Sequence, residues 1–185
     1  MGELLRRSAL QCPVVKKGAY DYFVHPLTDG VPRIEPALLK EVVDDILLVA
    51  DTRRVDLILT AEAMGIPLAT ALSERTGIPF AIIRKRSYGL EGEVSVSQVT
   101  GYSKGELFIN GVYRGDHVLF VDDVISTGGT LRAALQALRR IGAEVVDIVV
   151  VFEKGQGRKE LEAELDVKIK TLLRIEVEGG RVVLP

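Results

Sequence analysis

The sequence has no tryptophan, one cysteine, two histidines and an aromatic content of only 5%. The single cysteine, Cys12, excludes an internal disulfide, and we treat it as a small hydrophobic residue. With so few Cys and His residues, no cluster has the spacing of a protein metal site. Lysine and arginine (24) nearly balance aspartate and glutamate (26). This balance argues against a chain built mainly to coat nucleic acid.

Long apolar runs are also missing. Residues 145–152 form an apolar run that is far too short to cross a bilayer, and the N-terminus lacks the apolar core of a signal peptide. We therefore expect a cytoplasmic protein without membrane contacts. Apolar residues make up 47% of the 185, as expected of strands that are buried on both faces. The length predicts one domain, residues 1–185.

Strand and helix patterns alternate along the chain. The predicted strands cover residues 55–60, 79–84, 117–121, 145–152 and 167–175. The predicted helices cover residues 3–10, 66–76 and 130–141, and a further helix begins at Pro36. Gly77 and Gly142 stand just after two of these helices, where C-terminal caps are expected. This alternation predicts an α/β fold with a mostly parallel central sheet flanked by helices, and a ligand site beyond the carboxyl ends of the strands.

Three stretches depart from this alternation. Residues 20–36 contain three prolines and predict a loop-rich cap, which together with the preceding helix forms an N-terminal hood over residues 1–36. Residues 87–110 are rich in glycine and hydroxyl residues, and they predict a hairpin that can close as a flexible lid. Residues 174–185 predict an edge hairpin around Gly179 and Gly180.

The most informative segment runs from Val121 to Thr130 and reads V-D-D-V-I-S-T-G-G-T. It joins an apolar strand to a helix that carries an apolar face. Backbone N–H groups at a helix N-terminus have no intrahelical acceptor and converge on an anion there. Gly128 and Gly129 let that anion approach the main chain closely. The loop therefore predicts a phosphate site.

Side chains around this loop suggest the rest of the ligand. Ser126, Thr127 and Thr130 add hydroxyl donors for phosphate oxygens. Asp122 and Asp123 only accept hydrogen bonds and would repel a phosphate, so they suit sugar hydroxyls slightly further along. A ligand with a phosphate at one end and a diol in its middle satisfies both groups. The structural alternative is an ordinary strand-to-helix turn with Thr127 as the helix N-cap.

This segment resembles the hallmark of the phosphoribosyltransferase family, which joins an apolar strand and two acidic residues to a T-G-G-T type loop. The resemblance implies a type I phosphoribosyltransferase fold and a site for phosphoribosyl pyrophosphate (PRPP). It assigns Asp122 and Asp123 to the ribose hydroxyls and residues 126–130 to the 5′-phosphate. Two other phosphate-binding signatures, G-x-x-x-x-G-K-[ST] and a G-x-G-x-x-G after a strand, do not occur.

A second loop follows the predicted strand at residues 55–60 and precedes a helix, so its amides also point to an anion position. Its residues are Glu62, Ala63, Met64 and Gly65. The resemblance to purine phosphoribosyltransferases implies that this loop holds pyrophosphate; a tight turn is the alternative. Adenine phosphoribosyltransferases commonly carry arginine where this chain has Met64, which argues against adenine.

Three cations, Arg84, Lys85 and Arg86, close the next predicted strand. We expect them to bind pyrophosphate and to neutralise its growing charge as it leaves, against the alternative of a solvated basic strand end. We assign catalytic roles to Arg84 and Lys85 together with Asp122 and Asp123.

The predicted lid contains Tyr102 and Lys104, which match the first two positions of a Y-x-K-x-E-L pattern of adenine phosphoribosyltransferases. In that family a glutamate precedes the tyrosine, but here the residue is Gly101. The classical hypoxanthine/guanine enzymes carry an aspartate where this chain has Ser126. The best resemblance, over nearly the whole chain, is to the archaeal hypoxanthine/guanine phosphoribosyltransferases, which are built on the adenine-type scaffold.

In the hood, Phe23 and His25 are our candidates for contacts to the base, against the alternative of a packed loop aromatic and a surface histidine. His117, which opens a predicted strand, is expected to be structural.

The resemblance implies a purine salvage enzyme that converts hypoxanthine and guanine to IMP and GMP, releasing pyrophosphate. It also implies Mg²⁺ carried mainly by PRPP, with no metal held by protein ligands alone, and a homodimer. An adenine or xanthine phosphoribosyltransferase is the alternative among enzymes. A PRPP-sensing transcriptional regulator is the alternative outside enzymes, but it needs a DNA-binding segment, and no helix-turn-helix pattern is present.

Overall fold

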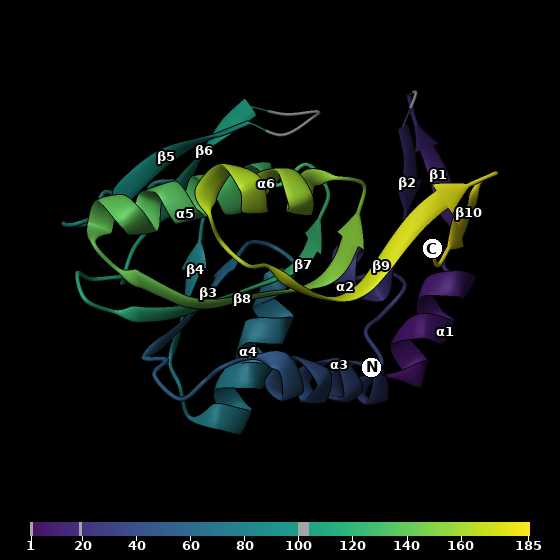
Figure 1. The fold of residues 1–185 in the computed structure, drawn as a ribbon, viewed down its shortest axis with the longest axis horizontal. Coiled ribbons are helices and arrows are strands. Elements are labelled where there is room, and N and C mark those ends of the chain that lie inside the picture. Colours follow the sequence, from purple (N-terminus) through teal and green to yellow (C-terminus); the bar gives the residue numbers. More distant parts are fainter. Residues whose placement is uncertain (1, 19, 100–103) are drawn as a thin grey trace.

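The computed structural model describes residues 2–18, 20–99 and 104–185. At its centre is a six-stranded sheet with the order β10-β9-β8-β7-β3-β4 (Figure 1). Its strands are β3 (Leu57–Ala61), β4 (Phe80–Ile83), β7 (His117–Ile125), β8 (Glu144–Lys154), β9 (Lys170–Glu178) and β10 (Arg181–Val183). All neighbours pair in parallel except β9 and β10, which form an antiparallel edge hairpin. The mostly parallel sheet and the C-terminal hairpin are thus confirmed.

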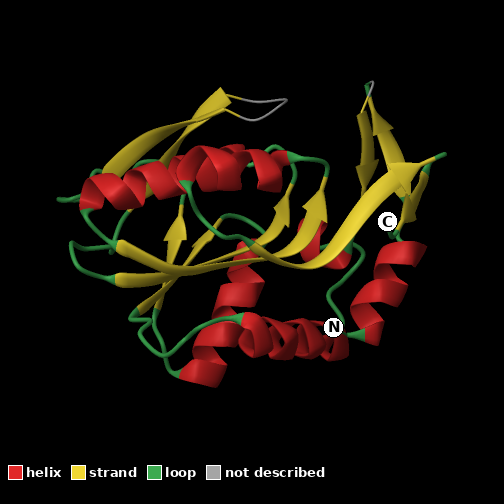
Figure 2. Ribbon diagram, in the orientation of Figure 1, coloured by secondary structure: helices red, strands yellow, loops and turns green. Residues whose placement is uncertain are grey.

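Helices cover both faces of this sheet (Figure 2). Helices α1 (Glu3–Gln11), α3 (Pro36–Val49) and α4 (Gly65–Thr76) pack on one face, and α5 (Gly129–Ile141) and α6 (Gly157–Leu165) lie over the other. Every residue of β3 is buried, as expected of a strand between two apolar layers. Across the described ranges, no helix combines the length and apolar character needed to span a membrane.

Glycines end two of the helices as expected. Gly77 follows α4 and Gly142 follows α5, and both adopt the left-handed conformation of a C-terminal cap. The apolar face of α5 is also confirmed, because its leucines and alanines are buried against the sheet. The start of α5 at the end of the 126–130 loop therefore has a fixed position.

The lid region contains an antiparallel hairpin, β5 (Val94–Val99) and β6 (Lys104–Ile109). It lies beside α5, on the same side of the sheet as α6 (Figure 1). The hairpin predicted for residues 87–110 is confirmed in this part, while Tyr102 lies outside the described residues.

The hood is more regular than its sequence indicates. It contains the antiparallel hairpin β1 (Val14–Lys17) and β2 (Tyr20–Phe23), followed by the short helix α2 (Pro26–Asp29). A positive φ at Gly18 accompanies the turn of the hairpin, and Pro26 opens α2. A strand pairing of four residues is too short to leave a clear alternation in the sequence, so the hairpin and the short helix of the cap were not predicted.

Three further differences concern the second half of the chain. Helix α6 was not predicted, because it is rich in charged residues and completely buries a single large apolar side chain, Leu161. Strand β7 continues to Ile125, so the two aspartates belong to the strand. Strand β9 begins at Lys170, later than expected.

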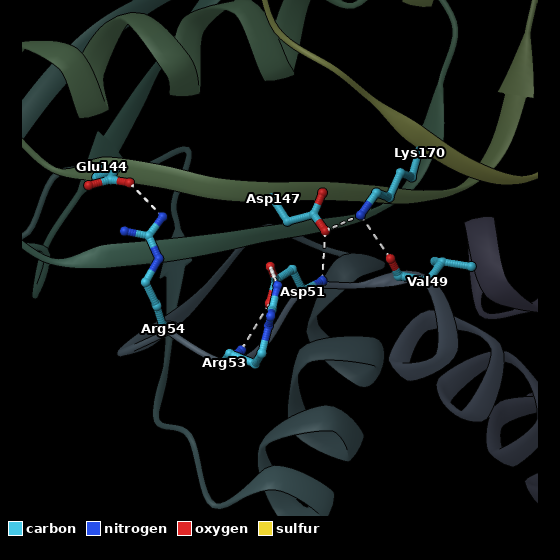
Figure 3. A network of polar contacts seen from close by, with 7 residues as sticks. All are labelled: Val49, Asp51, Arg53, Arg54, Glu144, Asp147 and Lys170. Atoms are coloured by element: carbon cyan, nitrogen blue, oxygen red, sulfur yellow. Dashed lines mark hydrogen bonds and ion pairs between the residues drawn. The ribbon is translucent and has the colours of Figure 1, made fainter.

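A polar network ties α3 to the amino ends of β8 and β9 (Figure 3). The buried carboxylate of Asp147 accepts hydrogen bonds from the backbone N–H of Asp51 at 2.8 Å and from Lys170 Nζ at 2.5 Å. Lys170 also donates to the carbonyl oxygen of Val49. In the same view, Arg54 and Glu144 form an ion pair between side chains that are 64% and 54% exposed.

The carboxylates of Asp147, which is buried, and Glu144, which is exposed, allow the effect of burial on stability to be tested. Replacing Asp147 by Ala leaves the Asp51 N–H without its acceptor, and we expect a loss of about 1–3 kcal/mol of unfolding free energy. Glu144→Ala removes an exposed pair and should cost about 0–1 kcal/mol. Thermal unfolding of both variants checks the order; equal losses would contradict it.

Candidate functional site

A cavity opens where β3, β4 and β7 end. Residues following each of these strands line it, together with two residues of the β5–β6 hairpin. The predicted site residues among its lining are Glu62, Lys85, Asp122, Asp123, Ser126, Thr127, Gly128, Gly129 and Thr130. The parallel sheet thus brings residues about 60 positions apart to one edge, as expected of the carboxyl ends of parallel strands.

The loop between β7 and α5, residues 126–130, forms one wall of this cavity. Gly128 has a φ of 73° and occupies the N-cap position of α5, which has no side-chain cap within the described structure. Thr127 is therefore not the N-cap, which corrects that part of the alternative interpretation. The first-turn N–H groups and the positive end of the helix dipole remain suited to an anion.

Asp122 and Asp123 form a desolvated carboxylate pair next to this loop. Asp122 is 8% exposed, and burial raises its pKa to about 6. Lys85 acts in the opposite direction on the same group. Burial raises the pKa of Asp123 as well, and the negative charge of Asp122 adds to the effect. A ligand that donates hydrogen bonds to these oxygens would relieve the cost of their lost hydration.

The N-terminus of α4 approaches this pair closely. A Cβ added at Gly65 would lie 1.8 Å from Oγ1 of Thr60 and 3.0 Å from Oδ1 of Asp122. Only glycine fits at this position. The Thr60 hydroxyl is buried and has no hydrogen-bond partner among the described residues.

Glu62 connects the ends of β3 and β4. Its carboxylate accepts a 2.5 Å hydrogen bond from the backbone N–H of Lys85 and pairs with the Arg84 guanidinium at 3.3 Å. The peptide bond between Glu62 and Ala63 is cis. Glu62 therefore fixes the direction in which the chain leaves β4.

The three cations that follow β4 do not converge. Lys85 lines the cavity, whereas Arg84 lines a separate groove on the outer side of β4. Arg86 stacks over the Tyr88 ring at 4.9 Å. The chain bends at Lys85 and Arg86, directly after β4, so the three neighbouring side chains leave it in different directions. The expectation that Arg84 and Arg86 meet pyrophosphate together with Lys85 is wrong for this arrangement.

The two hood residues expected to contact the base are packed inside the protein. Phe23 is 5% exposed and His25 is fully buried, and both rings make edge contacts with Phe152. His25 Nδ1 accepts from the N–H of Leu27, and His25 Nε2 lies 2.9 Å from the hydroxyl of Ser8. Burial lowers the pKa of His25 to about 4. A neutral His25 thus ties the start of α2 to α1 within the hood, which corrects the prediction of a direct base contact.

The hood nevertheless lies against the site. A Cβ added at Gly30, the residue after α2, would be 3.6 Å from Sδ of Met64. Lys154, at the end of β8, donates a 2.8 Å hydrogen bond to the carbonyl oxygen of Asp21. The hood is therefore attached next to the second loop and to the carboxyl edge of the sheet.

Gln98 is a cavity residue that sequence reasoning missed. It belongs to β5, lines the cavity and donates a 2.5 Å hydrogen bond to Oγ1 of Thr130. Its neighbours along the strand, Ser97 and Ser95, are exposed. A glutamine in a weakly patterned hairpin carries no signal of its own. Of the two predicted lid residues, Lys104 begins β6, and Tyr102 lies outside the described residues.

The lining of the cavity includes three carboxylates, those of Glu62, Asp122 and Asp123. In the described ranges, no group of three or more His, Cys, Asp or Glu residues is arranged to hold a metal ion. The neighbouring carboxylates of Asp122 and Asp123 are hard oxygen ligands, which suit a cation such as Mg²⁺ that arrives with a ligand. His117 lies at the amino end of β7, where it bonds Asp56 at 2.7 Å, in keeping with a structural role.

Comparisons with known proteins agree with this geometry. Residues 36–180 match the phosphoribosyl transferase domain family. A hypoxanthine/guanine phosphoribosyltransferase of Methanocaldococcus infernus is 59% identical over 97% of this chain and 98% of that protein. One from Methanocaldococcus jannaschii is 52% identical over 98% of this chain and 99% of that protein.

Solved structures show the same fold. An adenine phosphoribosyltransferase from Rhodothermus marinus superposes with a TM-score of 0.76 at 26% identity, covering 93% of this chain and 97% of that one. One from Thermoanaerobacter pseudethanolicus has a TM-score of 0.77 at 24% identity, covering 92% and 99%.

The raised pKa values of Asp122 and Asp123 predict how the stability of the folded protein changes with pH. A carboxyl group whose pKa is higher in the folded than in the unfolded state loses stability as the pH rises through the folded value. Asp123→Asn should therefore raise the melting temperature of the ligand-free protein at pH 8, by about 2–4 °C per kcal/mol. The difference should shrink towards zero as the pH falls to 4 and below, where Asp123 is protonated in the folded protein.

Thermal melts from pH 4 to pH 8 test this effect, with Asp56→Asn as the control. The hydrogen bond from His117 lowers the pKa of Asp56, so this control should not raise the melting temperature. A lower melting temperature for Asp123→Asn at pH 8 would contradict the desolvation argument.

Proposed function

Because this chain belongs to the phosphoribosyl transferase domain family, we propose that it transfers the 5-phosphoribosyl group of PRPP to hypoxanthine or guanine. The products are IMP or GMP and pyrophosphate, which makes it a purine salvage enzyme. One observation carries this proposal: a desolvated carboxylate pair adjoins an uncapped helix N-terminus in a chain that matches archaeal hypoxanthine/guanine phosphoribosyltransferases over its full length.

The β7–α5 loop would hold the 5′-phosphate. Backbone N–H groups at the start of α5 and the hydroxyls of Ser126, Thr127 and Thr130 are its donors. Asp122 and Asp123 would accept hydrogen bonds from the ribose hydroxyls and so recover part of the lost hydration. The Gln98 carboxamide, which already reaches Thr130, would close this end of the site.

Pyrophosphate would lie between the loop of residues 62–65 and Lys85. The Lys85 ammonium is the cation of this segment that lines the cavity, and it would stabilise charge on the departing group. Arg84 would act through its ion pair with Glu62, as a support for that loop. Mg²⁺ bound to PRPP oxygens, facing the carboxylates, would supply further neutralisation.

The reaction forms a bond between a purine ring nitrogen and C1′ while the bond from C1′ to the pyrophosphate oxygen breaks. The nitrogen loses its proton, and pyrophosphate leaves with the bonding electrons. Positive charge develops on the ribose in between. The protein would contribute by aligning the two reactants, by offering preorganised donors and by excluding water under the hood and hairpin.

Other activities are less well supported. Adenine phosphoribosyltransferases share the fold, but Met64 stands where arginine is common in them, and the relatives that match at 52–59% identity are named for hypoxanthine and guanine. A DNA-binding regulator would need an element that binds DNA, and the described N-terminal segment forms a hood packed on the sheet.

The free cysteine and balanced charge suit a cytoplasmic location.

We further propose that two copies associate through the groove beside β4. This edge strand borders a groove of about 900 Å³ that includes Phe80, Tyr88, Leu90 and Tyr113. Tyr88, Leu90 and Tyr113 are 46%, 59% and 69% exposed. Exposed apolar side chains that cluster on one face favour an interface, and two equal copies usually pair by a twofold axis.

Activity with four bases tests the main proposal. The protein is mixed with Mg²⁺, PRPP and hypoxanthine, guanine, adenine or xanthine in turn, and the nucleotides are separated by chromatography. We expect IMP and GMP. Formation of AMP or XMP alone would reassign the base, and DNA binding without any nucleotide would favour a regulator.

Point variants test the assigned roles. Thr127→Ala and Asp123→Asn should each lower turnover by about a hundredfold, since one preorganised donor or acceptor is worth about 2.7–4 kcal/mol of barrier. Gly128→Val should abolish PRPP binding, because a side chain there would meet Gly157 and Leu161 of α6 and is strained at a φ of 73°, so that the loop must shift; calorimetry can follow the loss. Thr70→Ala, an exposed threonine of α4, is the control. Near-normal turnover in the first two variants would overturn the roles.

The dimer proposal is tested by molar mass. Leu90→Glu places a charge in the groove and should reduce the mass measured by light scattering from twice 20.2 kDa to 20.2 kDa. Leu48→Glu changes a leucine of α3 that is 78% exposed and outside the groove, so it should leave the mass unchanged. A monomeric wild-type protein would contradict the proposal.

A further inference from the structure

One peptide of the β7–α5 loop is held from outside the loop. The backbone N–H of Gly157, the first residue of α6, donates a 3.0 Å hydrogen bond to the carbonyl oxygen of Ser126. The Ser126–Thr127 peptide bond is trans, and in a planar trans peptide the C=O and the N–H point in opposite directions. The N–H of Thr127 therefore points away from α6.

The loop separates α6 from the cavity. Ser126 and Thr127 line the cavity, but no residue of α6, all of which is described, belongs to its lining. An N–H that points away from α6 thus points toward the cavity side. The hydrogen bond from Gly157 to Ser126 thus sets the direction of the Thr127 N–H, a group that Gly157 itself does not contact.

Only glycine permits this contact. A Cβ added at Gly157 would lie 2.0 Å from the carbonyl oxygen of Ser126 and 2.7 Å from the carbonyl carbon of Thr127. The neighbours here are backbone atoms, which cannot rotate out of the way. From the loop side, a Cβ at Gly128 would lie 3.3 Å from the carbonyl oxygen of Gly157. Two glycines therefore let the loop and the helix meet.

The N-terminus of α6 is itself fixed. Arg158 Nε donates a 2.8 Å hydrogen bond to Glu153 Oε2, and the same carboxylate, in a residue that is 2% exposed, accepts from the Thr171 hydroxyl. Further along, Glu164 pairs with Arg132 of α5 at 2.8 Å. Helix α6 is thus attached to β8 through Arg158 and to α5 through Glu164, and it can act as a rigid support.

From this geometry we propose that Gly157 is a positioning residue for the phosphate end of PRPP. Its N–H orients the Ser126–Thr127 peptide so that the Thr127 N–H faces the phosphate. Because Gly157 has no side chain, α6 can approach the loop closely enough to form this hydrogen bond. This proposal rests on the function proposed above, but it concerns a residue outside the cavity.

The experiment compares Gly157→Ala with Ala163→Gly. The first change forces the loop and helix apart; the second weakens α6 at an exposed position without touching the loop. We expect Gly157→Ala to raise KM for PRPP by about tenfold, equivalent to about 1.4 kcal/mol, while KM for hypoxanthine stays within about twofold. Ala163→Gly should leave both constants unchanged. Equal effects on both substrates, or the same change in Ala163→Gly, would overturn the proposal.

A measurement on the wild-type protein covers the case in which Gly157→Ala does not fold. Hydrogen exchange of the Gly157 amide is followed by NMR with and without ribose 5-phosphate. We expect exchange at Gly157 to slow together with that at Thr127, since a filled phosphate site holds the shared peptide in place. Slowing at Thr127 alone would overturn the positioning role. Absence of ribose 5-phosphate binding and of IMP formation would instead overturn the proposed function.

Discussion

The desolvation of two neighbouring carboxylates is the physical constraint on which this site depends. Asp122 and Asp123 lose hydration at the end of β7, and burial raises both pKa values. The fold tolerates the cost because Lys85 lines the same cavity and favours the ionised form of Asp122. The adjacent start of α5 offers donors to an anion. A ligand that carries both hydroxyl groups and a phosphate complements these two halves of the cavity at once.

Close backbone approach is the second theme of the structure. Gly65 brings α4 against Thr60 and Asp122, and Gly157 brings α6 against the β7–α5 loop. A side chain at either position would collide with atoms of the cavity wall. At Gly65 the close neighbours are the side chains of Thr60 and Asp122, and at Gly157 they are main-chain atoms of Ser126 and Thr127, so glycine is required at both positions.

The sequence predicted the parts of the site that have a local signature. The strand, the two aspartates and the loop of residues 126–130 are consecutive, so their composition alone indicates a phosphate and a diol, and α5 follows from its apolar spacing. Helix α6 was missed, since charged residues cover most of it. The hood hairpin and the buried position of His25 were missed because they depend on Phe152 and Ser8, which come from other elements.

By itself, the sequence determined most strands and helices of the central sheet and its flanks, the edge of the sheet that carries the cavity, and the family resemblance, because each depends on neighbouring residues or on regular spacing. Only the tertiary structure decided which members of a local cluster share the cavity. Arg84 and Lys85 are adjacent in the chain, yet Arg84 lines the groove beside β4 and Lys85 lines the cavity, because the chain bends where it leaves β4. Likewise, Gly157 lies about thirty residues from the loop that it contacts, and only the packing of α6 brings the two together.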